Sequence, residues 1–295
     1  MSDRRPTIRV MISEPPLPAE LRALFADGSD AARTLSVPLP PGRPVRSEEE
    51  PSERPAFWLG DGPAPAGLWA RLRAEHVRSG LWPLLLDSLD DEDADYRPWG
   101  NGEVLPGEMS SPDDHDPDAL LARWWVDHTA DDPDDQLTPA ERAAVTAPFG
   151  RTWPGLAVAP PRGKDPDRIA DGLAEQLVAG HPSVRIGLVA ADRGADAVTV
   201  AGWTGPTNYT GDTAEVSAVL RSWEDRFGAR VVGVGFATLV LAVAAPPTTR
   251  EAAMAVAAEH FAFCPDNIWQ GEAPHTLAAY ADRLVDDHSW TFWWD

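Results

Sequence analysis

The chain has 295 residues, 43% of them hydrophobic, and a formal net charge of −22. This length supports a core that folds without disulfides or metal, and with Cys264 as the single cysteine no intramolecular disulfide can form. The acidity argues against nucleic-acid binding, which requires a basic surface.

Two features bear on export and membranes. The N-terminal residues lack the apolar segment of a secretory signal, and residues 231–249 form the longest uncharged stretch. Gly233, Gly235 and two prolines interrupt that stretch, which favours two short strands over a transmembrane helix. We therefore expect a cytoplasmic protein with no membrane partner.

Residues 1–160 are predicted to form an α/β region. Short apolar runs at residues 8–12, 34–39 and 56–59 predict strands, and residues 41–55 predict a mobile connection rich in Pro, Gly and Glu. Each run is bounded by turn-forming residues, so all three strands are expected to be short.

A helix over residues 68–79 and a buried strand over residues 81–86 follow. Gly80 ends the helix, because glycine accepts the left-handed conformation of a helix C-terminus. Pro83 restricts the strand to a sheet edge or an early ladder position, since proline has no amide hydrogen to donate.

Residues 87–118 are rich in Asp, Gly and Pro and predict a long acidic surface loop. Its carboxylates lack the EF-hand spacing, so we interpret them as solvated charges rather than a calcium site. Further elements are predicted between this loop and residue 183. They are helices over 118–129, 139–146 and 166–179 and a strand over 155–159, and the last helix lies in a connecting segment over 161–183.

Residues 184–295 have the clearest element boundaries, with a cap or a glycine at most of them. The predicted strands cover 184–190, 197–203, 230–234, 238–244 and 289–294, and the helices cover 212–227, 248–261 and 277–285. The whole pattern predicts an α+β fold with a mixed or antiparallel sheet packed by helices. The N-terminal α/β half either forms a second domain or extends the same sheet.

Several unusual sequence segments occur in order in this C-terminal part: WEDRFGARVVGVG, AVAAPP, AAEHFAFCPDNIWQG and WTFWWD. Residues 184–295 thereby resemble the domain-of-unknown-function 4253 family. The resemblance implies an α+β domain and supplies no catalytic residue.

His260 and Cys264 are four residues apart at the end of a predicted helix, which places imidazole and thiol on one face. A thiolate activated by histidine, with Asp266 or Asn267 orienting the ring, would act as a nucleophile. The alternative is that Cys264 is a small core residue, as its aromatic neighbours indicate. Metal binding by the same residues with Asp266 or Glu259 lacks the paired ligands of zinc sites, so neither metal nor cofactor is expected.

Two polar segments are candidate ligand or partner sites. Asp266, Asn267, Trp269 and Gln270 lie in a turn that could present polar groups beside an aromatic ring, or could bond to local backbone instead.

The second segment is the loop over residues 204–211. It carries Thr207, Asn208 and Tyr209 toward a helix N-terminus, where backbone amides can hold an anion unless Asp212 caps them.

The closing aromatics, Trp290, Phe292, Trp293 and Trp294, occupy both faces of a strand and predict that it is covered. An exposed aromatic patch for a partner is the alternative. The leading functional hypothesis is a non-catalytic protein- or ligand-binding module, whose acidity would suit a basic protein partner. The alternative is a cysteine-dependent hydrolase or transferase using Cys264 and His260.

Overall fold

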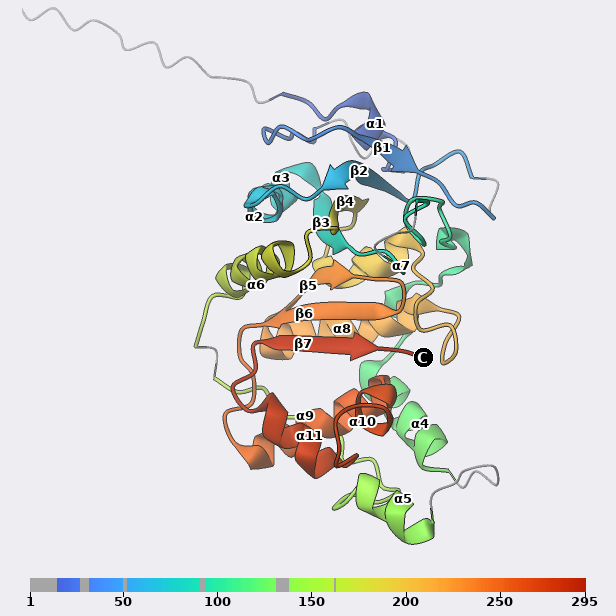
Figure 1. Cartoon of the computed structure of the whole chain (residues 1–295), viewed down its shortest axis with the longest axis vertical. Coiled ribbons are helices and arrows are strands. Elements are labelled where there is room, and N and C mark those ends of the chain that lie inside the picture. Colours follow the sequence, from blue (N-terminus) through green and yellow to red (C-terminus); the bar gives the residue numbers. More distant parts are fainter. Residues whose placement is uncertain (1–14, 27–31, 50–51, 91–93, 131–137, 162) are drawn as a thin grey trace, which may run out of the picture.

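The computed structural model describes residues 15–26, 32–49, 52–90, 94–130, 138–161 and 163–295. Its strands are β1 (Gly42–Val45), β2 (Phe57–Pro63), β3 (Leu81–Leu86), β4 (Arg185–Ala190), β5 (Ala229–Val234), β6 (Thr238–Val243) and β7 (Ser289–Trp293). Within these ranges they form one seven-stranded sheet in the order β1-β2-β4-β3-β5-β6-β7 (Figure 1). The sheet is mixed, because β3 and β5 are parallel and the other neighbours are antiparallel.

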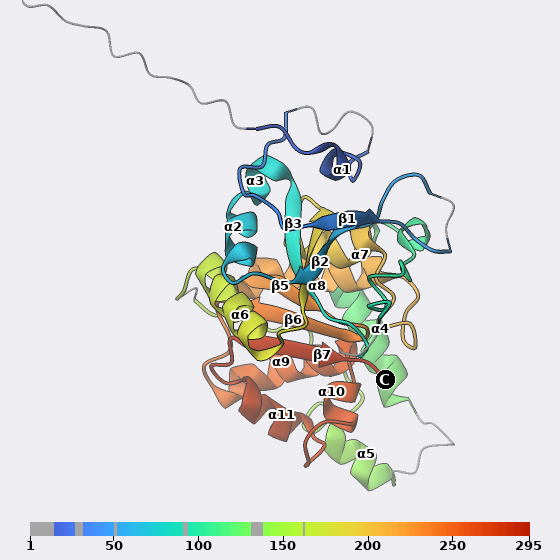
Figure 2. The ribbon, with the colours of Figure 1, turned by 45° about the horizontal axis from the view of Figure 1, so that its top comes forward.

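Helices pack on both faces of this mixed sheet, which is consistent with the predicted α+β class. They are α1 (Ala19–Arg22), α2 (Leu68–Ala74), α3 (His76–Ser79), α4 (Pro117–Thr129), α5 (Pro139–Val145), α6 (Pro166–Gly180), α7 (Ala197–Ala201), α8 (Thr213–Phe227), α9 (Arg250–Phe263), α10 (Asp266–Trp269) and α11 (Leu277–Leu284). Figure 2 shows α2 and α6 on one side of the sheet and α7 on the other. No helix in the described ranges is long and apolar enough to cross a bilayer.

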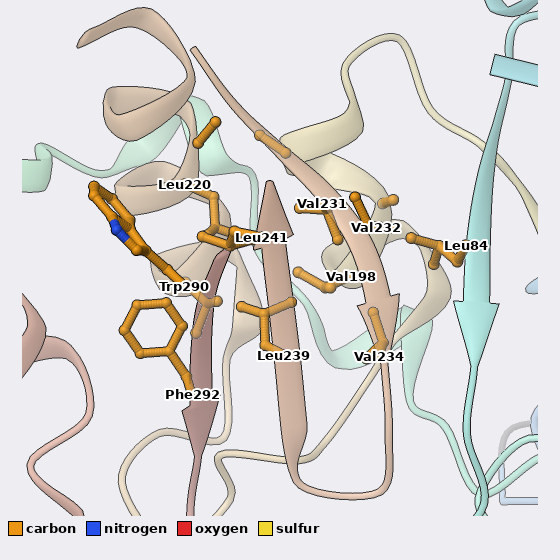
Figure 3. Close-up of a cluster of buried hydrophobic side chains, with 14 of the residues drawn as sticks. Leu84, Val198, Leu220, Val231, Val232, Val234, Leu239, Leu241, Trp290 and Phe292 are labelled. Atoms are coloured by element: carbon orange, nitrogen blue, oxygen red, sulfur yellow. The ribbon is translucent and has the colours of Figure 1, made fainter. Parts of the chain in front are cut away.

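The core lies where α8 packs on the C-terminal strands. Leu220 of α8, Leu241 of β6 and Trp290 of β7 are all buried and lie side by side (Figure 3). Side chains alternate between the faces of a strand, so Val240 lies on the opposite face from Leu241, toward α6. The uncharged stretch 231–249 thus forms most of β5 and all of β6, as predicted.

β3 is a central strand, so the edge position considered for it is excluded. It pairs with β4 over its whole length, whereas β5 pairs only with Leu85 and Leu86. The Pro83 carbonyl accepts a hydrogen bond from Trp69 Nε1 at 3.0 Å. Pro83 therefore lies ahead of the β3–β5 ladder, where no strand needs the hydrogen that proline lacks.

The predicted strand over 197–203 is wrong, since this segment begins with α7. Thr199 of α7 donates to the Thr213 carbonyl at 2.7 Å, and Gly202 ends the helix with φ of 70°. The β-branched residues at 198–200 suggested a strand, but a short apolar run that is buried on several sides has no period that separates helix from strand.

Three N-terminal and connecting segments also differ from prediction. Residues 34–39 form no strand, only an isolated bridge between Thr34 and Pro16. Residues 155–159 form none either, because the Ala157 amide donates to a side chain instead of a strand. Residues 41–55, predicted as a mobile connection, contain β1, and the strand predicted at residues 8–12 lies outside the described ranges.

The long acidic segment over 87–118 is irregular, as predicted, but it is not only a surface loop. It contains two short 3₁₀ turns, Pro106–Glu108 and Pro112–Asp114, ahead of α4. Tyr96 is buried and its hydroxyl donates to the Leu86 carbonyl at 2.6 Å. This bond ties the segment to the end of β3.

β7 lies at one edge of the sheet and one of its faces is open, so the prediction that both its faces are covered is wrong. Trp290 and Phe292 point into the core, whereas Thr291 is exposed and Trp293 keeps 40% of its surface exposed. The other predicted helices of the C-terminal part are found, with ends that differ by no more than two residues. The helix predicted over 68–79 is divided into α2 and α3 at Glu75.

Candidate functional site

The end of α9 places the two candidate catalytic side chains in the core. Cys264 and His260 are each fully buried. The Cys264 thiol donates to the Trp293 carbonyl at 3.0 Å and lies 3.5 Å from Asn267 Oδ1. His260 Nδ1 shares a hydrogen bond of 3.0 Å with the Tyr280 hydroxyl.

The order of these contacts differs from that of a nucleophilic triad. In a triad the imidazole bonds to the nucleophile and a third group orients the imidazole. Here Asn267 bonds to both the thiol and, at 3.1 Å, the Tyr280 hydroxyl, so two side chains stand between Cys264 and His260. The imidazole therefore has no hydrogen bond through which to take the thiol proton.

Burial also disfavours the protonation states of Cys264 and His260 that nucleophilic catalysis requires. It raises the pKa of the Cys264 thiol well above its ordinary value. Burial, assisted by the charge of Arg226, lowers the pKa of His260 to about 3. At neutral pH the thiol is protonated and the imidazole is uncharged, whereas a reactive cysteine needs a thiolate.

Asn267 covers the open edge of β7. Its Nδ2 donates to the Thr291 carbonyl at 2.7 Å, and its Oδ1 accepts from the Trp293 amide at 3.1 Å. The Asn267 side-chain amide thus makes the two backbone hydrogen bonds to β7 that a neighbouring strand would otherwise make. Exposed strand edges promote association with other strands, so this contact protects the sheet.

Four of the remaining predicted ligand residues, Asp266, Gln270, Asn208 and Tyr209, lie together near Asp295. Asp266 is buried and accepts from the Tyr209 hydroxyl at 2.8 Å, from Gln270 Nε2 at 3.1 Å and from the Asp295 amide at 3.1 Å. Asn208 donates to the Asp295 carbonyl. Burial, together with the Asp266 contact, raises the pKa of Tyr209.

Thr207 and Trp269 make different contacts. Thr207 is exposed in a turn closed by its amide on the Thr204 carbonyl. Trp269 is half-buried and lies edge-on to Phe261 and to His128, with ring centroids 5.4 and 5.8 Å apart. His128 was not singled out in the sequence, and burial lowers its pKa. Beside these rings and α5 is a pocket of about 140 Å³.

Glu259, considered as a metal ligand, is fully buried in a satisfied network. Its two oxygens accept from Arg226 at 2.7 and 2.6 Å, from Trp223 Nε1 at 2.7 Å and from the Ala157 amide at 2.6 Å. These bonds hold α8 and the segment around Ala157 against α9. Among the described residues, no three His, Cys, Asp or Glu side chains are grouped so that they could hold a metal ion.

A larger concave site lies elsewhere, at the carboxyl end of β4, and has a volume of about 500 Å³. We call it the β4 cleft. Its walls are residues 24–26 after α1, 54–56 before β2, 106–107 in the acidic segment and 190–192 after β4, with contributions from α7 and α8. Both halves of the chain therefore build it.

Charged side chains line this cleft. They are Arg33, Arg54, Asp192, Asp196 and Arg221. Arg221 of α8 binds Asp196 through two nitrogens, one of them at 2.9 Å, and its third nitrogen binds Asp113. The Asp196 hydrogen bond raises the pKa of Arg221.

Two of the lining charges remain available to a ligand. Arg54 and Asp192 are both exposed, and their side chains make no hydrogen bond or ion pair with any residue that the structure describes. Arg33 lies 4.4 Å above the Phe25 ring, so the cleft has an apolar as well as a charged wall.

Sequence reasoning did not find this site. Its charged residues come from stretches that are far apart in the chain, and Arg54 stands in no recognisable motif. The one available signal was the segment DRGAD over 192–196, which lies between the predicted strands 184–190 and 197–203. Its Asp196 is buried at 8% exposure, and this became visible only when α7 and α8 were in place.

The fold and the cleft together define an α+β protein with a helix-covered mixed sheet and a ligand-sized cleft. Residues 185–295 match the family model described as domain of unknown function (DUF4253), as the resemblance predicted. No curated protein and no solved structure matches the chain. Two of the sequence segments that carry the resemblance, WEDRFGARVVGVG and AAEHFAFCPDNIWQG, contain Trp223, Arg226 and Glu259. These three residues form the buried network described above.

Proposed function

We propose that this chain is a non-catalytic cytoplasmic binding module whose ligand is a small molecule bound in the β4 cleft. The observation that carries the proposal is the cleft itself, because about 500 Å³ lies within the range of small-molecule sites. Such sites combine apolar walls with a few polar groups that fix the ligand. In the β4 cleft, Phe25 and Val200 provide apolar walls, and Arg54 and Asp192 provide polar groups.

The alternative is a cysteine-dependent hydrolase or transferase at Cys264 and His260. It has less support, because both groups are enclosed and in the wrong protonation states at neutral pH. A cleft that opens onto either group would favour it, but the β4 cleft is lined by neither.

A basic protein partner is a second role that the net charge of −22 favours. Charge of this size accelerates association with a basic surface, and salt screens the effect. The charge is an average over the molecule and selects no docking face, so the cleft remains the better-supported site.

A variant that fills the cleft tests the proposed function. Val200 of α7 is half-buried and lines the cleft, so Val200→Trp should occupy its volume. Val126→Trp, on the exposed side of α4, is the matched control because its side chain is 57% exposed.

Both variants and the wild type would be screened against one diverse library of small molecules by ligand-observed NMR. The proposal expects at least one class of compound to bind the wild type and Val126→Trp at 1:1 stoichiometry and to lose binding to Val200→Trp. Compounds that bind all three proteins equally, or no binding to the wild type, would refute it.

A further inference from the structure

We propose that the ligand of the β4 cleft is a small anion whose carboxylate or phosphate group is bound by Arg54 and by Arg221. This inference rests on the proposed function and names the chemical class of the ligand. It follows from the charged side chains that line the cleft and from which of them are already paired within the protein.

The first step is the charge contrast between the cleft and the molecule. The protein carries a net charge of −22, yet three arginines and two aspartates line the cleft. One aspartate, Asp196, is already neutralised by Arg221. The lining side chains alone sum to one positive charge, and Asp113, which pairs with Arg221 from outside the cleft, offsets it. Against a molecule of net charge −22, this cleft is thus a locally neutral site with a guanidinium that is unpaired among the described residues, and the low-dielectric walls of a cleft strengthen the field of that group.

The second step is the unused guanidinium of Arg54. A guanidinium presents its N–H groups in a planar fork that matches a carboxylate or a phosphate through two parallel hydrogen bonds. Arg54 is exposed and none of these groups is used within the described residues, so binding an anion breaks no existing contact there.

The third step is the pairing of Arg221. Asp196 holds two of its nitrogens and so fixes the side chain, which is only 22% exposed. The third nitrogen is bonded to Asp113, whose side chain is 80% exposed. Such exposed ion pairs contribute little stability, so a ligand anion can replace the Asp113 carboxylate at low cost. Asp113 lines the adjoining pocket, which shares Pro112 and Arg221 with the β4 cleft, so an anion that reaches Arg221 from the cleft would compete with this carboxylate.

The test uses two probes, inorganic phosphate and citrate, titrated calorimetrically into the full-length protein at low ionic strength. Chloride at equal ionic strength is the reference. Three charge variants are compared with the wild type: Arg54→Ala, Asp113→Asn and Arg168→Ala. Arg168 lies exposed on α6 and does not line the cleft, so it is the matched control for loss of one positive charge.

We expect at least one probe to bind the wild type at 1:1 stoichiometry. Arg54→Ala should weaken binding about tenfold or more, the size of one bidentate charged contact. Asp113→Asn should tighten it severalfold, because the competing carboxylate is gone, and Arg168→Ala should leave it within about twofold. Phosphate binding alone points to a phosphate ligand, and citrate binding alone to a carboxylate.

Two results would overturn the inference: neither probe binds, or Arg54→Ala and Asp113→Asn bind as the wild type does. Failure of the proposed function has a different signature. If uncharged compounds bind the wild type but not Val200→Trp, the cleft is a ligand site and only the anionic class is wrong. If Val200→Trp binds every ligand as tightly as the wild type, the cleft is not the site.

Discussion

Cys264 and His260 show how the same residue types serve chemistry or packing according to their surroundings. Four-residue spacing on a helix predicts a shared face, and both side chains do point into one region of the core. The spacing could not reveal that Tyr280 and Asn267 would stand between them, because those residues come from other elements.

The thiol of Cys264 should therefore react slowly in the folded protein. As the single cysteine, it gives an unambiguous signal with an aromatic disulfide reagent. We expect native labelling at pH 8 to be at least about a hundredfold slower than labelling in denaturant, because burial raises the thiol pKa and blocks access. Rapid native labelling that persists below pH 7 would instead favour the cysteine-dependent enzyme.

His260 should make the fold sensitive to acid. Its folded-state pKa of about 3 lies below the ordinary 6.5, so between these values the unfolded chain binds a proton that the folded chain does not. Its contribution therefore lowers the free energy of unfolding as pH falls, by at most about 1.4 kcal/mol per pH unit.

Denaturant unfolding from pH 7 to pH 4 would measure this effect. Carboxylates also titrate in acid, so the informative quantity is the difference between the wild type and His260→Asn. The difference should change with pH below about 6.5. Parallel stability curves for the two proteins would show that His260 does not titrate this way.

Among the elements, those with their own end signals were predicted well. Thr138 and Glu141 form a capping box at the start of α5, and Gly228 ends α8 with φ of 62°. These signals depend on contacts within a few residues of sequence, which a pattern can show. The edge position of β7 depends on which strands come last in the sheet, and nothing within residues 289–294 specifies that order.

Asn267→Ala should destabilise the protein by uncovering the edge of β7. The substitution leaves the Thr291 carbonyl and the Trp293 amide without their side-chain partner. It also removes the contacts of Asn267 with the Tyr280 hydroxyl and the Cys264 thiol. We expect a loss of about 1–3 kcal/mol in the free energy of unfolding. Gln270→Ala, at an exposed position one turn away, removes one hydrogen bond to Asp266 and none to β7, so it should cost less than Asn267→Ala and no more than about 1 kcal/mol. Equal losses for the two variants would contradict the edge-covering role.

For the whole molecule, the order of the strands is what the sequence could not specify. The strands of the family-matched part are β4 to β7, yet β3 from the N-terminal half lies between β4 and β5. The sequence could not reveal the β4 cleft for the same reason. The residues that form its walls are far apart in the chain and meet only when the sheet is complete.

Residues 185–295 alone should consequently fail to fold. In this fragment β4 loses both neighbours, β2 and β3, and β5 loses its parallel partner. A fragment of residues 52–295 keeps β2 to β7 and should unfold cooperatively, which circular dichroism during thermal denaturation would measure. A cooperative transition of the short fragment would show that it closes a sheet of its own.

Hydrogen–deuterium exchange in the presence of phosphate or citrate tests the central claim most directly, because it locates the ligand. The account predicts slower exchange together in residues 52–56, 106–112 and 190–200, which surround the β4 cleft, and no change in α5. Protection confined to α5 and residues 261–269, or none with either probe at millimolar concentration, would contradict it.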